Sequence, residues 1–570
     1  MPAHQSWAVS HGAIKNPIAN ILAGRVTLAD TGTRQLDYDS DYWDLSQAAT
    51  ESQHMMLHSL RWLDPLLKEA LDAEDPAAYP HLPLLESQIA SWRTWSAAAK
   101  SAPGQAWLGH PTALRTSFLV GAGPVFGDRD WYEPLLREHL DYLIQEDNFS
   151  GFWNHGLAEA LALYAVGQHL GHDEATATGR DRIHGCIDEM VDQEGAINEQ
   201  ATQYAGYVLN LMVVCQRAFA ANQDLPSLEL AQAREAALQD FIRHATTPRG
   251  TYELIGDSFE GPVPSHMQRE FNRGGGLPEP NFGAHGRLAI YERGYVFARS
   301  GWGEERERAE EDFLSARFGP GRIIHGHNDH FSLTWYTAGR PVLVDSGHTG
   351  YAKGPYRSHL QSIQAHNLVE VVGQRHDWAA QTTLEWVGHQ DQQLRFELTD
   401  RAFAHVQRTR IVNFIPRKPL LVVDRLRSVR PKSYRQLWHI APQFSELVEL
   451  GALARVRDPQ AGLDAVLLPV CSGEAEPPLI DHWYGAEEPC QGWFSNAEGA
   501  REPAHAFGVN RSGGNVDFVT ALVVVPAGAE VRHRYKKRWF REAELEIHWA
   551  DQLTSYRFDG AGRPELVSGH

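Results

Sequence analysis

One short segment separates two parts of the chain whose apolar residues repeat with different periods. Residues 271–280 read Phe-Asn-Arg-Gly-Gly-Gly-Leu-Pro-Glu-Pro, and such a run of glycines and prolines neither continues a helix nor fits inside a sheet. The chain has 570 residues, which is too long for one ordinary hydrophobic core. We therefore predict an N-terminal extension (1–40), a helical domain (41–275) and a β-rich domain (276–570).

Before this boundary, apolar residues recur with the period of a helix. The pattern is clear in four segments: 56–63, 131–140, 157–170 and 204–221. Many helices in succession favour helical hairpins arranged as an array or a closed toroid. We see no exact internal repeat.

After the boundary, short runs rich in β-branched and aromatic residues take over. Examples are residues 294–300, 331–336 and 419–424, and an apolar run at 340–344. Such runs predict the strands of a large antiparallel sandwich. The predicted fold is thus multidomain, with a helical part followed by a β part.

Charge and composition exclude several classes of protein. A formal net charge of −20 argues against nucleic-acid binding, and an anionic substrate would need a local basic cleft. No stretch of about 18 apolar residues predicts a membrane span. The four scattered cysteines imply neither a disulfide framework nor a paired-cysteine metal site.

The first residues of the sequence lack a basic region followed by an apolar core. The expected location is therefore the cytoplasm, or the periplasm or exterior if a signal has been removed. The sequence leaves a homo-oligomer open.

The β-rich part holds an unusual cluster of histidines. Residues 325–330 read His-Gly-His-Asn-Asp-His, and on a strand His325, His327 and Asp329 would share one face. Asp345 ends an apolar run, where a carboxylate is costly unless it is paired or binds a metal. Two histidines and one aspartate suit zinc. Because the chain has 29 histidines, clustering without a metal is the alternative.

Two places in the helical part also carry polar side chains suited to chemistry. Asn154 and His155 precede the helix predicted at 157–170, where helix N–H groups attract a carboxylate; simple N-capping by Asn154 is the alternative. Tyr204 follows the polar residues Glu199 and Gln200 at the start of another predicted helix. Its alternative is a core tyrosine whose hydroxyl finds a partner at the edge.

In order along the chain, these segments resemble the heparinase II/III-like polysaccharide lyases. The resemblance is most specific in the second part and looser over the two-domain layout. The matching segments are Asn154-His155, Glu199 to Tyr204, Gly294 to Trp302, His325 to Asp329, Leu343 to Gly347 and Ala365 to Asn367.

The resemblance implies a fold and a set of roles. The fold would be an N-terminal incomplete (α/α) toroid followed by a C-terminal antiparallel β-sandwich. Asn154 and His155 would contact a uronate carboxylate, Tyr204 would carry a proton, and His325 would be a further catalytic histidine. A zinc ion with a structural role would be held by three side chains, namely His327, Asp345 and His366.

The chain departs from the family pattern at a few positions, and these leave the substrate subclass open. Ser346 follows Asp345 where the family commonly has proline, and Ala201 and Ala205 replace a serine and a histidine. We expect β-elimination on a 4-linked uronate-containing polysaccharide or oligosaccharide, so the partner is an anionic sugar. Candidate substrate-binding residues are Gln200, Arg273 and Arg357.

Two other functions compete with this prediction. A glycoside hydrolase on a helical toroid would need two carboxylates in its cleft, for which Glu159, Glu194 and Glu199 are candidates. A carbohydrate-binding protein without catalysis would use some of the 17 tryptophans and 18 tyrosines to stack on sugars. Binding alone does not require asparagine, histidine and tyrosine together, so the lyase is favoured.

Overall fold

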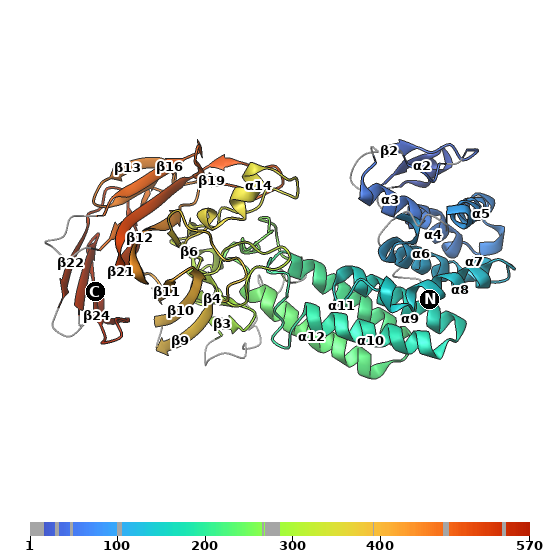
Figure 1. The fold of residues 1–570 in the computed structure, drawn as a ribbon, viewed down its shortest axis with the longest axis horizontal. Helices are drawn as coiled ribbons and strands as arrows, with labels where there is room; N and C mark the ends of the chain where they lie inside the picture. Colours follow the sequence, from blue (N-terminus) through green and yellow to red (C-terminus); the bar gives the residue numbers. More distant parts are fainter. Residues whose placement is uncertain are drawn as a thin grey trace. The chain divides into compact units, whose positions relative to one another are not determined.

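A computed structural model of the chain describes residues 16–28, 33–40, 42–45, 49–99, 105–264, 267, 286–390, 393–470, 478–537 and 543–569. The chain forms two compact units (Figure 1). The first unit comprises Met1–Gly195 and Val208–Ala237, and the second comprises Ala196–Tyr207 and Leu238–His570. The predicted boundary near residue 275 lies outside the described residues.

The first unit is helical, as predicted. Its helices are α2 (Ile18–Leu22), α3 (Glu51–His58), α4 (Asp64–Asp72), α5 (Leu82–Ala99), α6 (Gly109–Gly121), α7 (Gly123–Phe126), α8 (Tyr132–Leu143), α9 (Asn154–Leu170) and α10 (Asp173–Met190). Helix α11 (Tyr204–Ala221) starts in the second unit and continues in the first. Helix α12 (Leu225–His244) starts in the first unit and ends in the second. A small hairpin, β1 (Arg25–Thr27) with β2 (Thr33–Gln35), precedes α3.

Amphipathic helices build the core of this unit. On α8 the buried side chains include Leu136, Leu140 and Leu143, which follow the helical repeat and face inward. The segment predicted as an N-terminal extension also contributes to this core, through Ile21 and Val26. Burial of these side chains therefore joins the described part of residues 16–40 to the helical unit.

Helices α9 and α10 pack closely because small residues line their contact. A Cβ atom added at Gly179 on α10 would lie 2.5 Å from the backbone nitrogen of Tyr164 on α9. Only glycine fits such an approach without a shift of one helix. The sequence at this point thus fixes the distance between two helices, one of which begins with Asn154.

The second unit consists mainly of antiparallel sheets, as predicted. A five-stranded sheet has the order β3 (Leu288–Tyr291), β4 (Tyr295–Arg299), β5 (Phe313–Arg317), β6 (Leu333–Thr337) and β7 (Arg340–Leu343). A four-stranded sheet has the order β22 (Val531–Lys537), β23 (Ala543–Trp549), β24 (Gln552–Phe558) and β25 (Pro564–Gly569).

A ten-stranded sheet is the largest element of this unit. Its main path is β13 (Glu446–Leu450), β14 (Ala454–Asp458), β15 (Leu463–Pro469), β21 (His505–Pro526), β12 (Leu420–His439), β11 (Val406–Phe414), β10 (Gln393–Phe403) and β9 (Thr383–Gln390). Strand β8 (Val369–Val371) pairs with β12, and β16 (Ile480–Tyr484) pairs with β21. Short pairs form between β17 (Ala486–Glu487) and β18 (Cys490–Gln491), and between β19 (Trp493–Phe494) and β20 (Glu502–Pro503). A short helix, α14 (Pro355–Leu360), lies between β7 and β8 in the sequence.

The ten-stranded sheet is buried on both faces. Val412 and Val422 belong to a core shared with the five-stranded sheet. Their neighbours Ile411 and Leu421 belong to a second core with Leu545 of the four-stranded sheet. Because successive side chains point to opposite faces, a central strand such as β12 begins with a continuous apolar run at 420–423, and the three sheets stack as layers.

The histidine-rich segment is not a strand, so that prediction was wrong. Residues 320–332 form a loop with two turns between β5 and β6. His325 has a φ of 61°, in the left-handed region, which ends any extended run. His325 and His327 alternate with Gly326 and Asn328, as residues on the two faces of a strand would. Neither set is apolar, so the segment has no face that could pack against a core.

Two expectations from composition can be compared with the structure. Among the described residues, no helix is long and apolar enough to cross a membrane. Cys186, Cys215 and Cys490, which lie in the part of the chain that the structure describes, carry free thiols.

Candidate active site and metal site

The segment 196–207 carries the predicted tyrosine and binds the histidine loop. Tyr204 is the first residue of α11. The buried side chain of Gln200 donates to the carbonyls of Pro320 and Gly321, at 3.3 and 3.2 Å, and accepts from the backbone nitrogen of Ile323 at 3.0 Å. Gln200, predicted to bind substrate, therefore holds the loop that leads to His325.

Tyr204 and His325 lie face to face. Their ring centroids are 4.0 Å apart and their planes are inclined by 21°. The hydroxyl of Tyr351 hydrogen-bonds to the hydroxyl of Tyr204 and lies 3.4 Å from Nδ1 of His325. Two phenols and one imidazole thus form a single cluster on the second unit.

The electrostatics of this cluster keep the phenol of Tyr204 protonated at neutral pH. Burial raises the pKa of Tyr204 far above its usual value, and the hydrogen bond with Tyr351 raises it further. The charges of Glu199 and Asp257 act in the same direction. Tyr204 therefore carries the proton that a general acid needs, and it must lose that proton before it can act as a base.

Glu199 lies on the other side of His325. One carboxylate oxygen of Glu199 is 3.5 Å from Nε2 of His325. Burial raises the pKa of Glu199, while the nearby His325 lowers it. A buried carboxyl group beside an imidazole is a pair that can share or move a proton.

Asp257 is the centre of the polar contacts behind this cluster. It accepts from Arg357 at 2.7 Å, from Nε2 of His327 at 2.9 Å, and from Nδ1 of His325 at 3.3 Å. Although burial alone would raise the pKa of Asp257, hydrogen bonds from these groups and from His348 hold it well below its usual value. Asp257 is therefore a carboxylate in the folded protein. The guanidinium of Arg357, predicted to bind substrate, is directed at Asp257 and His348.

The backbone around Asp257 is also joined to the histidine loop. The N–H of Asp257 donates to the carbonyl of His325 at 2.9 Å. Gly256 has a φ of 59°, and a Cβ atom there would lie 2.3 Å from the carbonyl oxygen of Gln200 and 2.6 Å from that of His325. Glycine is thus required where three backbone segments meet.

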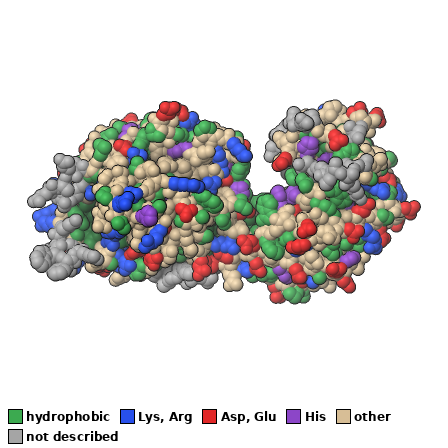
Figure 2. Space-filling model, viewed as in Figure 1, with side chains coloured by type: hydrophobic (Ala, Val, Ile, Leu, Met, Phe, Trp, Pro, Cys, Tyr) green, Lys and Arg blue, Asp and Glu red, His purple; other side chains and the backbone are tan. Residues whose placement is uncertain are grey.

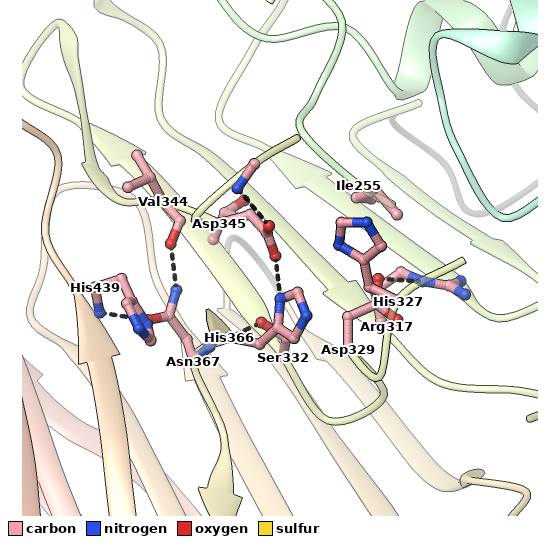
Figure 3. Close-up of polar contacts among 12 residues, drawn as sticks. Ile255, Arg317, His327, Asp329, Ser332, Val344, Asp345, His366, Asn367 and His439 are labelled. Carbon is pink, nitrogen blue, oxygen red and sulfur yellow. Dashed lines mark hydrogen bonds and ion pairs between the residues drawn. The ribbon is translucent and has the colours of Figure 1, made fainter. Parts of the chain in front are cut away.

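The three predicted metal ligands come together beside this network (Figure 3). One ligand atom each from His327, Asp345 and His366 lies within 4.8 Å of the other two, and all three residues are buried. Nδ1 of His366 hydrogen-bonds to Asp345 at 2.7 Å, and the attraction of Asp345 raises the pKa of His366 against the effect of burial. Nδ1 of His327 and Nε2 of His366 are buried without a hydrogen-bond partner among the described residues. Two unpaired imidazole nitrogens beside a carboxylate fit a zinc ion.

A second set of potential ligands shares His327. Asp257, His327 and His348 also converge within 4.8 Å. Arg357 already lies 2.6 Å from one oxygen of Asp257 and 2.7 Å from the other. A fixed guanidinium repels a cation at that distance, so the set with Asp345 and His366 is the better metal site.

Rigid strands position the metal set. The side chain of Asn367 donates to the carbonyl of Leu333 at 2.8 Å. It also donates to the carbonyl of Val344 at 2.9 Å (Figure 3). It also accepts from the backbone nitrogen of His439 at 2.6 Å. These bonds join His366, which precedes Asn367, and Asp345, which follows Val344, to strands β6 and β12. Asp329 pairs with Arg317 at 3.5 Å and is outside the metal set.

Asn154 and His155 belong to the first unit, whose site is described by itself. Asn154 is the first residue of α9, and the N-cap is Trp153, which makes no side-chain cap bond. The capping alternative for Asn154 was therefore wrong by one position. Its Oδ1 atom is buried without a partner in the described structure. The ring of His155 stacks on those of Trp153 and His110, at 4.4 and 4.1 Å, and burial lowers its pKa.

Other predicted residues have local roles or lie outside the described residues. Arg273 is outside them. The carboxylate of Glu159 accepts hydrogen bonds from the N–H and the hydroxyl of Ser150, at 2.8 and 2.7 Å. These bonds already engage one of the carboxylates that the hydrolase alternative would need. Sequence reasoning missed Asp257 and Tyr351, neither of which lies in a matched segment. An aspartate between glycine and serine in a loop carries no periodic signal.

Comparison with known proteins assigns the β-rich segment that carries His325 and the metal set. Residues 294–512 match the family model of the heparinase II/III-like C-terminal domain. This segment is similar to that domain. A search of the curated proteins gives no match. The match covers strands β4 to β20 and the start of β21, and it includes all three predicted zinc ligands.

Solved structures extend the likeness over both units. A mutant heparan sulfate lyase HepC from Pedobacter heparinus is similar with a TM-score of 0.70 and 14% identity, covering 99% of this chain and 93% of that chain. A heparinase III with methylated lysines gives 0.71 and 14%, covering 97% and 90%. Another heparinase III gives 0.66 and 13%, covering 98% and 91%. The predicted fold class, an incomplete (α/α) toroid followed by an antiparallel β-sandwich, is confirmed.

Proposed function

We propose that this chain is a polysaccharide lyase that cleaves a 4-linked uronate-containing polysaccharide or oligosaccharide by β-elimination. The observation that carries the proposal is the stacked pair of Tyr204 and His325, with Tyr351 at both and Glu199 beside the imidazole. The heparinase II/III-like domain and the likeness in fold to heparan sulfate lyases support it.

The reaction requires charge neutralisation before proton removal. The C5 proton of a uronate is weakly acidic while the neighbouring carboxylate is charged. In the proposal, Asn154 and His155 donate hydrogen bonds to that carboxylate and stabilise the enolate-like intermediate. One well-placed donor supplies roughly 3–4 kcal/mol. Asn154 makes no side-chain cap bond at the start of α9, which supports this role, because an amide that caps a helix is not available to a ligand.

Tyr204 and His325 would then handle the protons. The C5–H bond breaks, its electrons form the C4–C5 double bond, and the C4–O bond breaks with a proton delivered to the leaving oxygen. The raised pKa keeps the proton on Tyr204, whose hydroxyl can give it to that oxygen as the C4–O bond breaks. Because a protonated phenol cannot take a further proton, the C5 proton goes to His325, whose ring is stacked on that of Tyr204. General acid or base catalysis of this kind contributes about 10²–10⁴-fold.

Zinc is part of the proposal as a structural ion held by His327, Asp345 and His366. When bound, it would supply a fixed positive charge that ties three separate segments together. His327 is two residues from His325, so the ligand set would stiffen the loop that carries the catalytic histidine.

In the proposal, an anionic sugar is recognised by a few hydrogen-bond donors at the site and not by a broad basic surface. The net charge is −20, and Figure 2 shows acidic and basic side chains mixed over the visible face. Recognition of an anionic sugar must then rest on specific contacts near the cluster.

Incubation with hyaluronan, chondroitin, heparan sulfate, alginate, glucuronan and gellan-type chains tests the proposal. A lyase produces unsaturated uronate ends, which absorb in the ultraviolet, whereas a hydrolase produces new reducing ends without that absorbance. Binding of a chain without any cleavage would favour the carbohydrate-binding alternative. No cleavage of any of these chains by folded, zinc-loaded protein would overturn the uronate assignment.

A further inference from the structure

We infer that Asp257 is a positioning residue that orients the catalytic imidazole of His325 and the metal-binding imidazole of His327 at the same time. This inference rests on the proposed function for the role of His325. Asp257 lies in the loop before residue 264 and outside the heparinase II/III-like domain, which contains both histidines. The loop that carries Asp257 would thus connect the catalytic cluster, which contains His325, with the metal set, which contains His327.

The two oxygens of Asp257 divide their contacts between the two histidines. Oδ1 accepts from Nε2 of His327 at 2.9 Å, and Oδ2 lies 3.3 Å from Nδ1 of His325. Arg357 contacts both oxygens, at 2.6 and 2.7 Å, and so fixes the plane of the carboxylate. Only 2% of the Asp257 side chain is exposed, so water does not compete for these bonds.

For His327, the contact decides which ring nitrogen can bind a metal. A carboxylate only accepts hydrogen bonds, so the proton of His327 lies on Nε2 and Nδ1 is left with a lone pair. Nδ1 is the buried atom without a partner among the described residues, and the metal set includes His327. A carboxylate behind a metal-binding histidine sets its tautomer and ring orientation.

For His325, the contact fixes both the ring and the strained backbone. The bond to Asp257 puts a proton on Nδ1 and directs Nε2 towards Glu199, 3.5 Å away. His325 has a φ of 61°, a left-handed backbone conformation that is strained for a residue other than glycine. The N–H of Asp257 donates a hydrogen bond to the carbonyl of His325 at 2.9 Å and so stabilises this conformation. Side chain and backbone of one residue thus keep the imidazole against Tyr204.

The test is a double-mutant cycle with Asp257→Asn, His325→Ala and the pair together. Asp257→Asn keeps the size of the side chain and removes its charge. At saturating zinc we expect kcat to fall about 10–100-fold with little change in KM, which is the usual cost of losing an orienting partner. In the His325→Ala background, Asp257→Asn should cause no further loss of the residual kcat, because two residues that act as a unit are not additive.

Zinc affinity is the second measurement, and it does not depend on turnover. Titration of metal-free protein with zinc should show a roughly 10–100-fold weaker affinity for Asp257→Asn than for the wild type. The matched control is Asp464→Asn, which removes a buried carboxylate paired with Arg455 and Arg457 in the same unit. We expect that control to lower thermal stability and to leave kcat and zinc affinity unchanged.

The outcomes separate this inference from the proposed function. Wild-type zinc affinity in folded Asp257→Asn, full recovery of its kcat by added zinc, or an additive loss with His325→Ala would each overturn the positioning role. If Asp257→Asn does not fold, Asp257→Glu keeps the charge and moves it by one methylene, and we expect it to lower kcat and zinc affinity. An absence of unsaturated product from wild-type protein would refute the lyase instead, and the zinc titration would still decide the contact with His327.

Discussion

The imidazole of His325 lies flat against the phenol ring of Tyr204, with centroids 4.0 Å apart and planes inclined by 21°. Each residue is held from its backbone. Tyr204 starts a long helix, and Gln200, one turn before it, binds the loop that leads to His325. The backbone of both residues is thus held in place, and the stacked pair is a fixed feature of the second unit.

Tyr204→Phe should abolish turnover and leave folding and substrate binding nearly unchanged. The substitution removes only the hydroxyl, whose proton is the one that the proposed reaction moves. We expect a loss of at least about 10²-fold in kcat, measured from the initial rate of unsaturated product.

The matched control is Tyr336→Phe in the same unit. Its hydroxyl donates to the carbonyl of Ala309 at 2.8 Å, so the change costs one hydrogen bond away from the cluster. That variant should lose a little stability and keep its kcat. If Tyr204→Phe retained more than about a tenth of the wild-type rate, a general acid or base role for Tyr204 would be excluded.

Asn154→Ala should reduce kcat and leave thermal stability nearly unchanged. The side chain makes no cap bond and its Oδ1 atom has no partner in the described structure, so its removal costs the folded state little. Thr50→Ala is the control, because Thr50 forms a capping box with Gln53 at the start of α3. Its loss should cost about 1 kcal/mol of stability without lowering kcat. A fall in the melting temperature of Asn154→Ala like that of Thr50→Ala would favour a structural role.

Purified protein should contain about one zinc ion per chain, and His327→Ala, Asp345→Ala or His366→Ala should each release it. The reason is that each variant removes one of the three converging ligands. Elemental analysis of protein purified without added metal measures the content, and calorimetry follows the stability of the β-rich unit. His376→Ala, a change at a half-buried histidine of that unit, should keep the metal. Metal-free wild-type protein would reduce the three residues to a hydrogen-bonded cluster.

Much of the fold was predictable because each layer has its own period. Apolar side chains on α8 follow the helical repeat, and the apolar run at 420–423 that opens β12 matches a sheet buried on both faces. The metal set was found because His327, Asp345 and His366 stand in motifs that the family shares. Their convergence within 4.8 Å agrees with that prediction, while metal binding itself stays a prediction.

The rest of the site could not be derived from local patterns. Asp257 becomes important only through contacts with His325, His327 and Arg357, which are distant in the sequence. Tyr351 lies in a loop after β7 and meets Tyr204 through the tertiary fold. The loop at 320–332 resembles a strand in sequence because His325, His327 and Asp329 alternate with other residues, but neither set of alternate residues forms an apolar face.

Stability should fall as the pH decreases from about 7 to about 5, because several buried histidines are neutral in the folded protein. Burial lowers the pKa of His58 from 6.5 to about 3, and Arg115 lowers it further; burial likewise lowers the pKa of His110 from 6.5 to about 3. Below pH 6.5 the unfolded chain binds protons at these residues that the folded chain does not bind. Their contribution is fully present above pH 6.5 and declines progressively until the pH reaches about 3.

His58→Phe isolates this effect. It keeps a ring beside Trp95, which stacks on His58 at 4.8 Å, and removes the titrating group. We expect a smaller difference in melting temperature between pH 7 and pH 5 than in the wild type, measured by differential scanning calorimetry. His54→Phe changes a partly exposed histidine on the same helix, α3, and should keep the wild-type difference. An unchanged pH dependence in His58→Phe would show that this residue does not contribute, because the neutral buried imidazole is the only group that the substitution removes.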